Sequence, residues 1–373
     1  MKNLLFILLL STAILCSCEK IEQPELYPLV QTIEINQNIY TNTTFFGGTR
    51  YLIKYNIELS DSAILTINPG AIVIFEGTTF YTSEYSGASI QAIGTADSLV
   101  QFKGVGFYNG YQNNQGYISL AGGISSTFEF CSFDDVAITE QNARMTINNC
   151  HFQECSFGVQ IYNYGFKEFD FNTFSSVENH NTCIHIGLDQ VYTLGGNNEY
   201  DSHQQIKVES EYEYISGVHQ WKAQTAPLVF YDDLIISNSG YDQLTIDPGS
   251  TLQFQDGSFQ VSGVLIAKGT ESRPITFEAY PSTSSTHYWE GIKFQGFPNS
   301  SEMTYCVIKN GGQGGWSTQA NIYIQSNSLN SIRISNCTIS DSYGYGIFSQ
   351  TGAIPPYVSQ NQYSNNTTAN FNW

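Results

Sequence analysis

The chain contains an internal duplication. LTINPG at 65–70 returns as LTIDPG at 244–249, and AIGT at 92–95 returns as AKGT at 267–270. Between residues 50 and 370, apolar and polar residues alternate in short runs separated by Gly, Asn, Asp and Ser, without helical periodicity. Self-similarity built from short β-rich phrases indicates a repeat architecture in which each unit packs only on its neighbours.

A shorter repeat lies inside each copy. The phrases are FCSF at 130–133, NCHF at 149–152 and FNTF at 171–174, then YCVI at 305–308, NCTI at 336–339 and NQY at 361–363. A strand, a fixed turn and an inward aromatic residue in each phrase are what one coil of a parallel β-solenoid requires. Coils stack about 4.8 Å apart, so like residues form ladders.

The phrases predict two kinds of ladder. One is an inward aromatic stack formed by Phe130, Phe133, Phe152, Phe171 and Phe174. The other is a stack of core thiols, with disulfides as the second alternative. Its members are Cys131, Cys150, Cys306 and Cys337, with Asn172 and Asn361 in the same slot.

The NPG and DPG turns, the Gly-Thr corners at 94 and 269, the strand RPITF at 273–277 and the Cys/Asn ladder carry a resemblance. The chain resembles the right-handed parallel β-helix, or pectin-lyase-like, proteins, here as a repeat lipoprotein of Gram-negative bacteria. The resemblance implies an all-β, right-handed parallel β-helix (β-solenoid) with two internally duplicated modules.

The duplication predicts the organisation of the chain. We expect a lipoprotein signal peptide at 1–17, an acidic tether at 18–30, an N-terminal cap with the first β-helix module at 31–225, and a second module at 226–373. The cap is expected between Gln31 and Gly48. The sequence leaves open whether the modules form one continuous solenoid.

The N-terminus predicts export. Lys2 precedes an apolar run from Leu4 to Leu15 that is too short to span a bilayer. LCSC at 15–18 resembles a bacterial lipobox, which implies that Cys18 is the lipidated first residue; an ordinary signal peptide is the alternative. The acidic segment after Cys18 resembles leaders that send lipoproteins to the cell surface. We therefore expect an outer membrane lipoprotein facing outward, with a periplasm-facing anchor as the alternative.

The charge limits the choice of partner. A net charge of -19, from 14 basic and 33 acidic residues, argues against nucleic acid, because phosphate binding needs clustered Lys and Arg. The same deficit argues against direct contact with an anionic polysaccharide. A neutral polysaccharide or surface glycan is the expected partner.

The resemblance implies the catalytic residues of pectate lyases or polygalacturonases, but neither group of residues is present in full. One group of residues remains as a catalytic or cation-binding candidate. Asp134 and Asp135 follow Cys131 as Glu154 follows Cys150 one coil later, and His151 lies beside them. Carboxyl groups about 4.8 Å apart suit acid/base chemistry or Ca²⁺. Solvated turn residues are the preferred alternative.

Aromatic residues make up 14% of the chain and cannot all lie in the core. Those in Gly-rich or polar stretches predict surface rings for sugar stacking. These candidate glycan contacts are Trp289, Trp316, Tyr343 and Tyr345. No metal site is predicted from His180, Cys183 and His185, whose spacing fits no zinc pattern.

These observations predict a lipid-anchored cell-surface binding or adhesion module, for a glycan. The alternatives are a carbohydrate-active enzyme, either a polysaccharide lyase or a glycoside hydrolase, and a non-catalytic scaffold for a protein partner.

Overall fold

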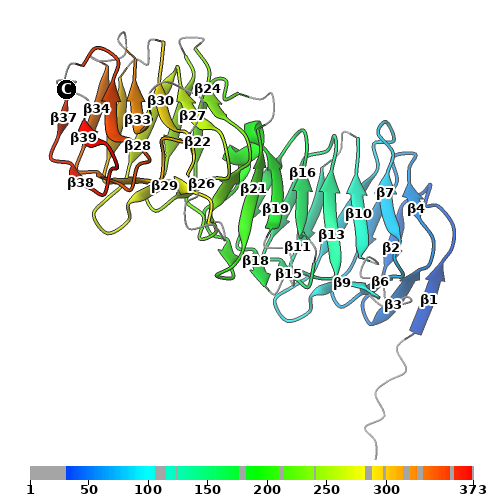
Figure 1. The fold of residues 1–373 in the computed structure, drawn as a ribbon. Helices are drawn as coiled ribbons and strands as arrows, with labels where there is room; N and C mark the ends of the chain where they lie inside the picture. Colours follow the sequence, from blue (N-terminus) through cyan, green and yellow to red (C-terminus); the bar gives the residue numbers. More distant parts are fainter. Residues whose placement is uncertain are drawn as a thin grey trace, which may run out of the picture.

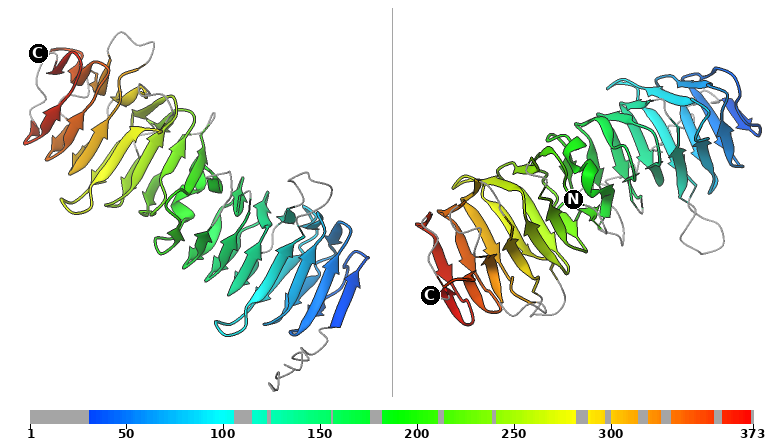
Figure 2. Two further views of the ribbon diagram at one scale, coloured as in Figure 1. Left: turned by 60° about the horizontal axis from the view of Figure 1, so that its bottom comes forward. Right: turned by 90° about the horizontal axis from the view of Figure 1, so that it is seen from above.

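The structure is a computed structural model. It describes residues 31–105, 115–122, 125–155, 157–175, 182–210, 214–238, 241–281, 288–296, 300–313, 319–325, 331–352 and 357–371. The fold is a right-handed parallel β-helix, as predicted, and every strand pairing within its five sheets is parallel. Figure 1 shows an elongated stack of coils, and Figure 2 shows the same stack from two further directions.

One 13-stranded sheet, called here the long sheet, passes through both halves. Its strands are β4 (Ile57–Leu59), β7 (Thr79–Thr82), β10 (Gly116–Leu120), β13 (Val136–Glu140), β16 (Val159–Ile161), β19 (Thr182–Gly187), β21 (Gln205–Glu209), β23 (Leu228–Phe230), β26 (Thr251–Phe254), β29 (Ile275–Ala279), β32 (Cys306–Lys309), β35 (Thr338–Ser340) and β38 (Gln362–Ser364). The two modules therefore form one continuous solenoid.

Two other sheets, N1 and N2, complete the coils of the first half. N1 contains β1 (Gln31–Ile35), β3 (Thr49–Ile53), β6 (Ile72–Phe75), β9 (Val100–Gly104), β12 (Cys131–Asp134), β15 (His151–Gln153), β18 (Thr173–Ser175) and β20 (Glu199–Tyr200). N2 contains β2 (Thr43–Phe45), β5 (Ile64–Ile67), β8 (Ser89–Ile93), β11 (Ser126–Glu129), β14 (Met145–Asn148) and β17 (Phe166–Asp170). The segment expected to cap the solenoid supplies β1 and β2, so it forms the first coil.

Sheets C1 and C2 complete the coils of the second half. C1 contains β22 (Val218–Trp221), β25 (Gln243–Ile246), β28 (Val264–Lys268), β31 (Ser301–Thr304), β34 (Ile332–Ser335) and β37 (Val358–Ser359). C2 contains β24 (Leu234–Ile236), β27 (Ser258–Val261), β30 (Gly291–Phe294), β33 (Ala320–Ile324), β36 (Tyr345–Ser349) and β39 (Ala369–Phe371).

The duplicated strands occupy different faces in the two halves. By the sequence repeat, β5, β6 and β7 correspond to β25, β26 and β27. The first set lies in N2, N1 and the long sheet, whereas the second lies in C1, the long sheet and C2. The second module is therefore rotated by one face relative to the first, and the long sheet combines non-equivalent strands.

The change of face occurs around residues 188–221. The 3₁₀ helix η1 (Leu188–Thr193) follows β19, where the chain would otherwise enter N2. η1 is the single helix among the described residues. The described part of the chain contains no helix that is long and apolar enough to span a bilayer. N1 and N2 end here and C1 and C2 begin, so β21 and β23 of the long sheet are the strands that join the halves directly.

The repeated corners are set by turn chemistry. The amide of Ala71 donates to the Asn68 carbonyl and that of Ser250 to the Asp247 carbonyl, while Gly70 and Gly249 take φ of +78° and +92°. Proline at the first central position and a positive φ at the second define this turn. The predicted Pro-Gly turns are therefore confirmed in both modules.

An inward ring ladder runs through the first half. Phe102, Phe133, Phe152, Phe174 and Tyr200 stack in sequence, with centroids 4.6 to 5.2 Å apart and planes within 11° of parallel. The prediction was wrong for Phe130 and Phe171, which take φ of +50° and +58° at the corner before each N1 strand, where Phe130 is partly exposed and Phe171 is 59% exposed. Their phrase position is that of Asn149, whose φ is also positive, so this slot is a corner.

The thiol ladder is confirmed. Every cysteine in the described part of the chain is buried and free. The amide of Cys150 donates to Asn172 Oδ1 at 3.0 Å and that of Cys337 to Asn361 Oδ1 at 2.9 Å, so thiols and carboxamides share one slot. Asn198 extends this ladder by accepting from the Asn172 amide, a member that the sequence phrases did not indicate.

We expect Phe152→Ala to lower the free energy of unfolding by about 3–5 kcal/mol, because the ring lies between two stacked neighbours and its loss leaves a cavity in the core. Urea unfolding followed by circular dichroism measures the change. Phe171→Ala is the matched control: its ring is 59% exposed, so the change should stay within about 0.5 kcal/mol. Equal losses for both variants would contradict the ladder.

Candidate functional site

The predicted carboxylates lie at the corner between N1 and the long sheet. Asp134 ends β12, where Lys103 and Gln153 flank it on the neighbouring strands. Asp135 and Glu154 follow in successive coils with φ of +55° and +53°. Asp and Asn tolerate this left-handed conformation better than most residues, so the corner itself accounts for part of this composition.

The structure places two of the candidates, Asp134 and Glu154, within electrostatic range of a third, Asp135. Burial, and then the nearby charges of Asp134 and Glu154, raise the pKa of Asp135 to about 6. Burial and then Asp135 raise the pKa of Tyr117, which begins the adjoining coil of the long sheet. A carboxyl group with this pKa can exchange a proton near neutral pH.

His151 has other partners. Its Nδ1 lies 2.6 Å from Thr173 Oγ1, and its Nε2 lies 3.2 Å from both Gln153 Oε1 and Ser175 Oγ. These groups belong to N1, so both ring nitrogens are engaged by polar neighbours on the outside of that sheet. The structure does not bring the imidazole into contact with the carboxylates of the corner.

The corner lacks a counterpart in the second module. The equivalent positions, directly after β32, β35 and β38, are Asn310, Asp341 and Asn365, all with positive φ. Asp341 accepts hydrogen bonds from Ser340 and Asn365. In the described residues of both modules, no group of three or more His, Cys, Asp and Glu side chains has the arrangement of metal ligands. The corner of the first module is thus a proton-exchange candidate.

The prediction for Trp289 was wrong. Its ring is fully buried, stacks on Phe254 with centroids 4.3 Å apart, and donates from Nε1 to the Lys309 carbonyl at 2.9 Å. A ring held in this way belongs to the core of the second half. Trp316 lies outside the described residues.

Tyr343 and Tyr345 are at the surface of the second half. Tyr343 is 46% exposed and meets the Tyr288 ring edge-on. Tyr345 meets the edge of Phe348, which in turn lies nearly parallel to Tyr323 with centroids 6.0 Å apart. Tyr345 is therefore part of a partly exposed ring group on C2.

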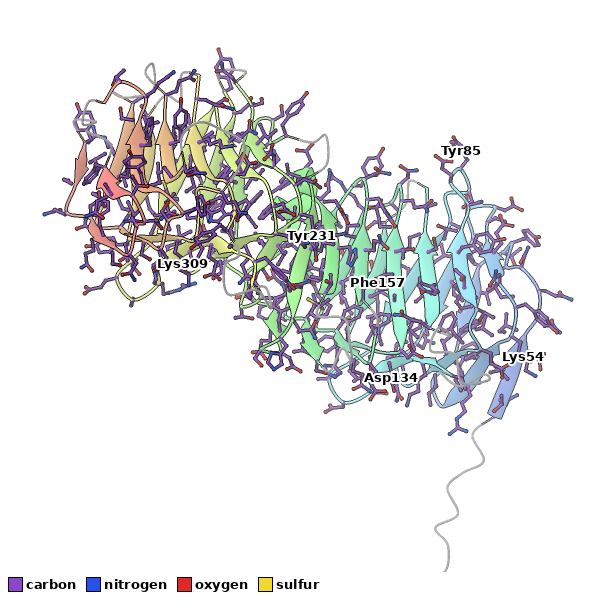
Figure 3. The ribbon with its side chains drawn as sticks, viewed as in Figure 1. Lys54, Tyr85, Asp134, Phe157, Tyr231 and Lys309 are labelled. Carbon is purple, nitrogen blue, oxygen red and sulfur yellow. The ribbon has the colours of Figure 1, made fainter. Side chains whose placement is uncertain are left out.

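A second surface group lies on the outer face of the long sheet and was not predicted. We call it the central strip; its members are Tyr117, Phe157, His185, Lys207, Glu209, Tyr231 and Tyr280. The Phe157 ring lies 6.3 Å from Tyr117 and 5.6 Å from His185. All of these side chains are at least partly exposed. Figure 3 shows Phe157 and Tyr231 over the same front face of the solenoid.

Charge pairing continues the strip across the join between the modules. Lys207 Nζ, on β21, lies 2.7 Å from Glu209 Oε1. It also lies 4.9 Å from the centroid of the Tyr231 ring, and Tyr231 directly follows the neighbouring strand β23. Burial, and then the Lys207 charge, lower the pKa of His185, so its imidazole is neutral at pH 7. One paired cation and carboxylate thus lies between the rings of the first half and Tyr231.

This mixture can hold a sugar. Flat rings offer π faces to the C–H groups of a pyranose, while the paired charges and the neutral imidazole accept and donate hydrogen bonds to hydroxyls. The strip could not be predicted from the sequence, because its members come from coils of unequal length. The only local signal was a polar or aromatic residue between apolar ones, as at Lys207 between Ile206 and Val208.

Comparison with known proteins adds no identification: no protein-family model, curated protein sequence or solved structure matches the chain. The fold and the surface groups above therefore carry the functional argument.

We expect Asp135→Asn to raise the free energy of unfolding at pH 7.5 by about 1 kcal/mol, a value reduced because the side chain is only half-buried. The carboxyl group binds its proton more tightly in the folded chain. Wild-type stability therefore falls as the pH rises from about 4 to about 6, and the gain of the variant should vanish near pH 4.

Urea unfolding at several pH values measures the effect. The control is Asp341→Asn, a corner position with the same backbone conformation and with Ser340 and Asn365 as neighbours. A gain for Asp135→Asn that is the same at pH 4 and pH 7.5 would contradict the raised pKa.

Proposed function

We propose that this protein is a lipid-anchored, outer-membrane β-helix module of pectin-lyase-like type that binds a neutral glycan at the cell surface. The central strip is the observation that carries the proposal: partly exposed rings lie on both sides of a paired Lys and Glu, on the outer face of the sheet that runs the length of the solenoid. A long sheet face suits an extended polymer better than a small metabolite.

The charges favour a neutral glycan. The lysines that lie within 4.0 Å of a carboxylate oxygen are Lys54, Lys207, Lys222, Lys268, Lys293 and Lys309. Their charges are already compensated, in a chain with a net charge of -19. An anionic polysaccharide would meet repulsion over most of this surface, whereas hydroxyl groups pair with neutral and zwitterionic side chains alike.

Affinity electrophoresis through gels containing galactomannan, xyloglucan, mixed-linkage β-glucan or, as the anionic comparison, polygalacturonate tests the proposal. We expect retardation by at least one neutral polymer. Tyr231→Ala should weaken this retardation about 10-fold, because a stacking ring contributes on the order of 1–2 kcal/mol in such contacts.

Tyr85→Ala is the matched control, because Tyr85 is 92% exposed and Figure 3 places it at the upper edge, away from the central strip. Its retardation should equal that of the wild type. Retardation by polygalacturonate alone, or an equal loss for both variants, would argue against the proposal.

The anchor is tested separately. Cys18→Ala should leave the protein unlipidated and released from membranes, because a single thiol carries the lipid in the lipobox that the sequence resembles. Metabolic labelling with a fatty-acid analogue and membrane fractionation measure the two effects. Cys150→Asn is the control, because Cys150 is buried in the thiol ladder and Asn already occupies the next position of that ladder, at Asn172. This variant should leave labelling unchanged. Membrane retention of Cys18→Ala that still requires detergent would contradict the lipobox.

A carbohydrate-active enzyme is the second candidate, supported by the raised pKa of Asp135 beside Asp134 and Glu154. If the corner cleaves glycan, Asp135→Asn should lower the release of reducing ends or unsaturated products at least 100-fold. A retained polymer with no product from the wild type would leave the binding proposal in place and remove the enzyme.

A further inference from the structure

A second ring and polar group lies on sheet C2, on a different face from the central strip. Gln260, Lys293, Tyr323 and Phe348 occupy neighbouring positions on β27, β30, β33 and β36, in the outward row of that sheet. We call this row the C2 row. Tyr323 and Phe348 lie within 19° of parallel, and Tyr345 meets Phe348 edge-on.

A hydrogen-bonded polar group lies at the other end of the row. Gln260 donates to Asp233 Oδ2 at 2.7 Å, and Gln295 donates to Gln260 Oε1 at 2.9 Å. Lys293 is paired with Glu290 and is only 5% exposed, so its charge is compensated beneath the surface. The row thus places two nearly parallel rings two strands from the Gln260 amide and its Asp233 partner, with the buried Lys293 between them.

The rotation between the modules accounts for the two faces. The strands of C2 are the sequence equivalents of first-half strands of the long sheet, as β27 is of β7. Had the second module continued in phase, the strands of C2 would lie in one sheet with the first-half strands of the long sheet, which carry Tyr117 and His185. Because it is rotated by one face, the outward side of C2 is separated from that of the long sheet by the corners that follow β23, β26, β29 and β32.

We infer that the protein is bivalent and holds two neutral glycan chains at once, one on the central strip and one on the C2 row; this inference rests on the proposed function. A single straight polysaccharide segment cannot contact the outward sides of two sheets of the same coil. Two segments can, so the protein joins neighbouring chains of a polysaccharide layer, and joint engagement raises the apparent affinity without any additional type of contact.

A sandwich assay with the full chain tests the inference. The neutral polysaccharide that gives the strongest retardation is immobilised on a sensor, the protein is captured, and the same polysaccharide is then injected in solution. We expect the captured wild-type protein to bind the second layer. Tyr231→Ala, and the double variant Tyr323→Ala with Phe348→Ala, should each still bind the immobilised polysaccharide. In both, the amount of soluble polysaccharide bound by the captured protein should fall at least 10-fold.

Tyr241→Ala is the control, because Tyr241 is 85% exposed and belongs to neither group, so both layers should match the wild type. Circular dichroism and thermal unfolding verify that each variant is folded. A variant that fails this check is replaced by Tyr231→Leu, or by Tyr323→Leu with Phe348→Leu, which keeps bulk and removes the ring.

The outcomes separate the two proposals. An unchanged second layer in the C2 variant overturns bivalency and leaves a single binding face, and so does complete loss of the first layer in Tyr231→Ala. A second layer that survives both sets of substitutions also overturns it, because self-association of the protein then supplies the bridge. A wild-type protein that no neutral polysaccharide captures overturns the proposed function and bivalency together.

Discussion

In-register stacking of parallel strands about 4.8 Å apart is the constraint on which the rest of this structure depends. Each residue meets its counterpart one coil away, so a side chain must pack or hydrogen bond with a similar side chain. The ring ladder from Phe102 to Tyr200 satisfies this condition by stacking, and the Cys/Asn ladder satisfies it through backbone amides that donate to Asn172 and Asn361.

The same constraint explains how much the sequence predicts. Ladder members repeat as phrases, so the parallel solenoid, the Pro-Gly turns and the thiol slot follow from the alignment of short words. The outward pattern is harder to predict, because coils differ in length: Ser132 pairs with His151 19 residues later, whereas Val100 pairs with Cys131 31 residues later. Neighbours on the outer face, such as Phe157 and His185, therefore share no fixed spacing.

The errors have physical causes. Phe130 and Phe171 belong to a phrase with two aromatic positions, and one of them falls on a left-handed corner that turns its side chain outward. Trp289 follows a polar stretch that is typical of a loop, yet its ring fills the core against Phe254. Of the predicted carboxylate group, Asp134 and Glu154 lie within electrostatic range of Asp135, whereas His151 Nδ1 lies 2.6 Å from Thr173 Oγ1 in N1. Strand alternation alone does not distinguish these surroundings.

Function on this scaffold depends on which face each strand reaches, because the outer faces are free to vary while the ladders are not. The central strip uses the one sheet shared by both modules, and the Lys207 contact with Tyr231 crosses their join. The C2 row uses strands that the rotated repeat has moved to another face. Binding chemistry and fold are therefore nearly independent here, as is usual for repeat scaffolds.

Hydroxyl-radical footprinting of the tyrosines, with and without a retained neutral polysaccharide, tests the central claim most directly. The account predicts that Tyr117, Tyr231 and Tyr280 lose reactivity when the polysaccharide is present, whereas the exposed Tyr85 and Tyr241 react as before. Protection of Tyr85 and Tyr241 with unchanged reactivity at Tyr231 would place the glycan elsewhere and contradict the central strip as the binding surface.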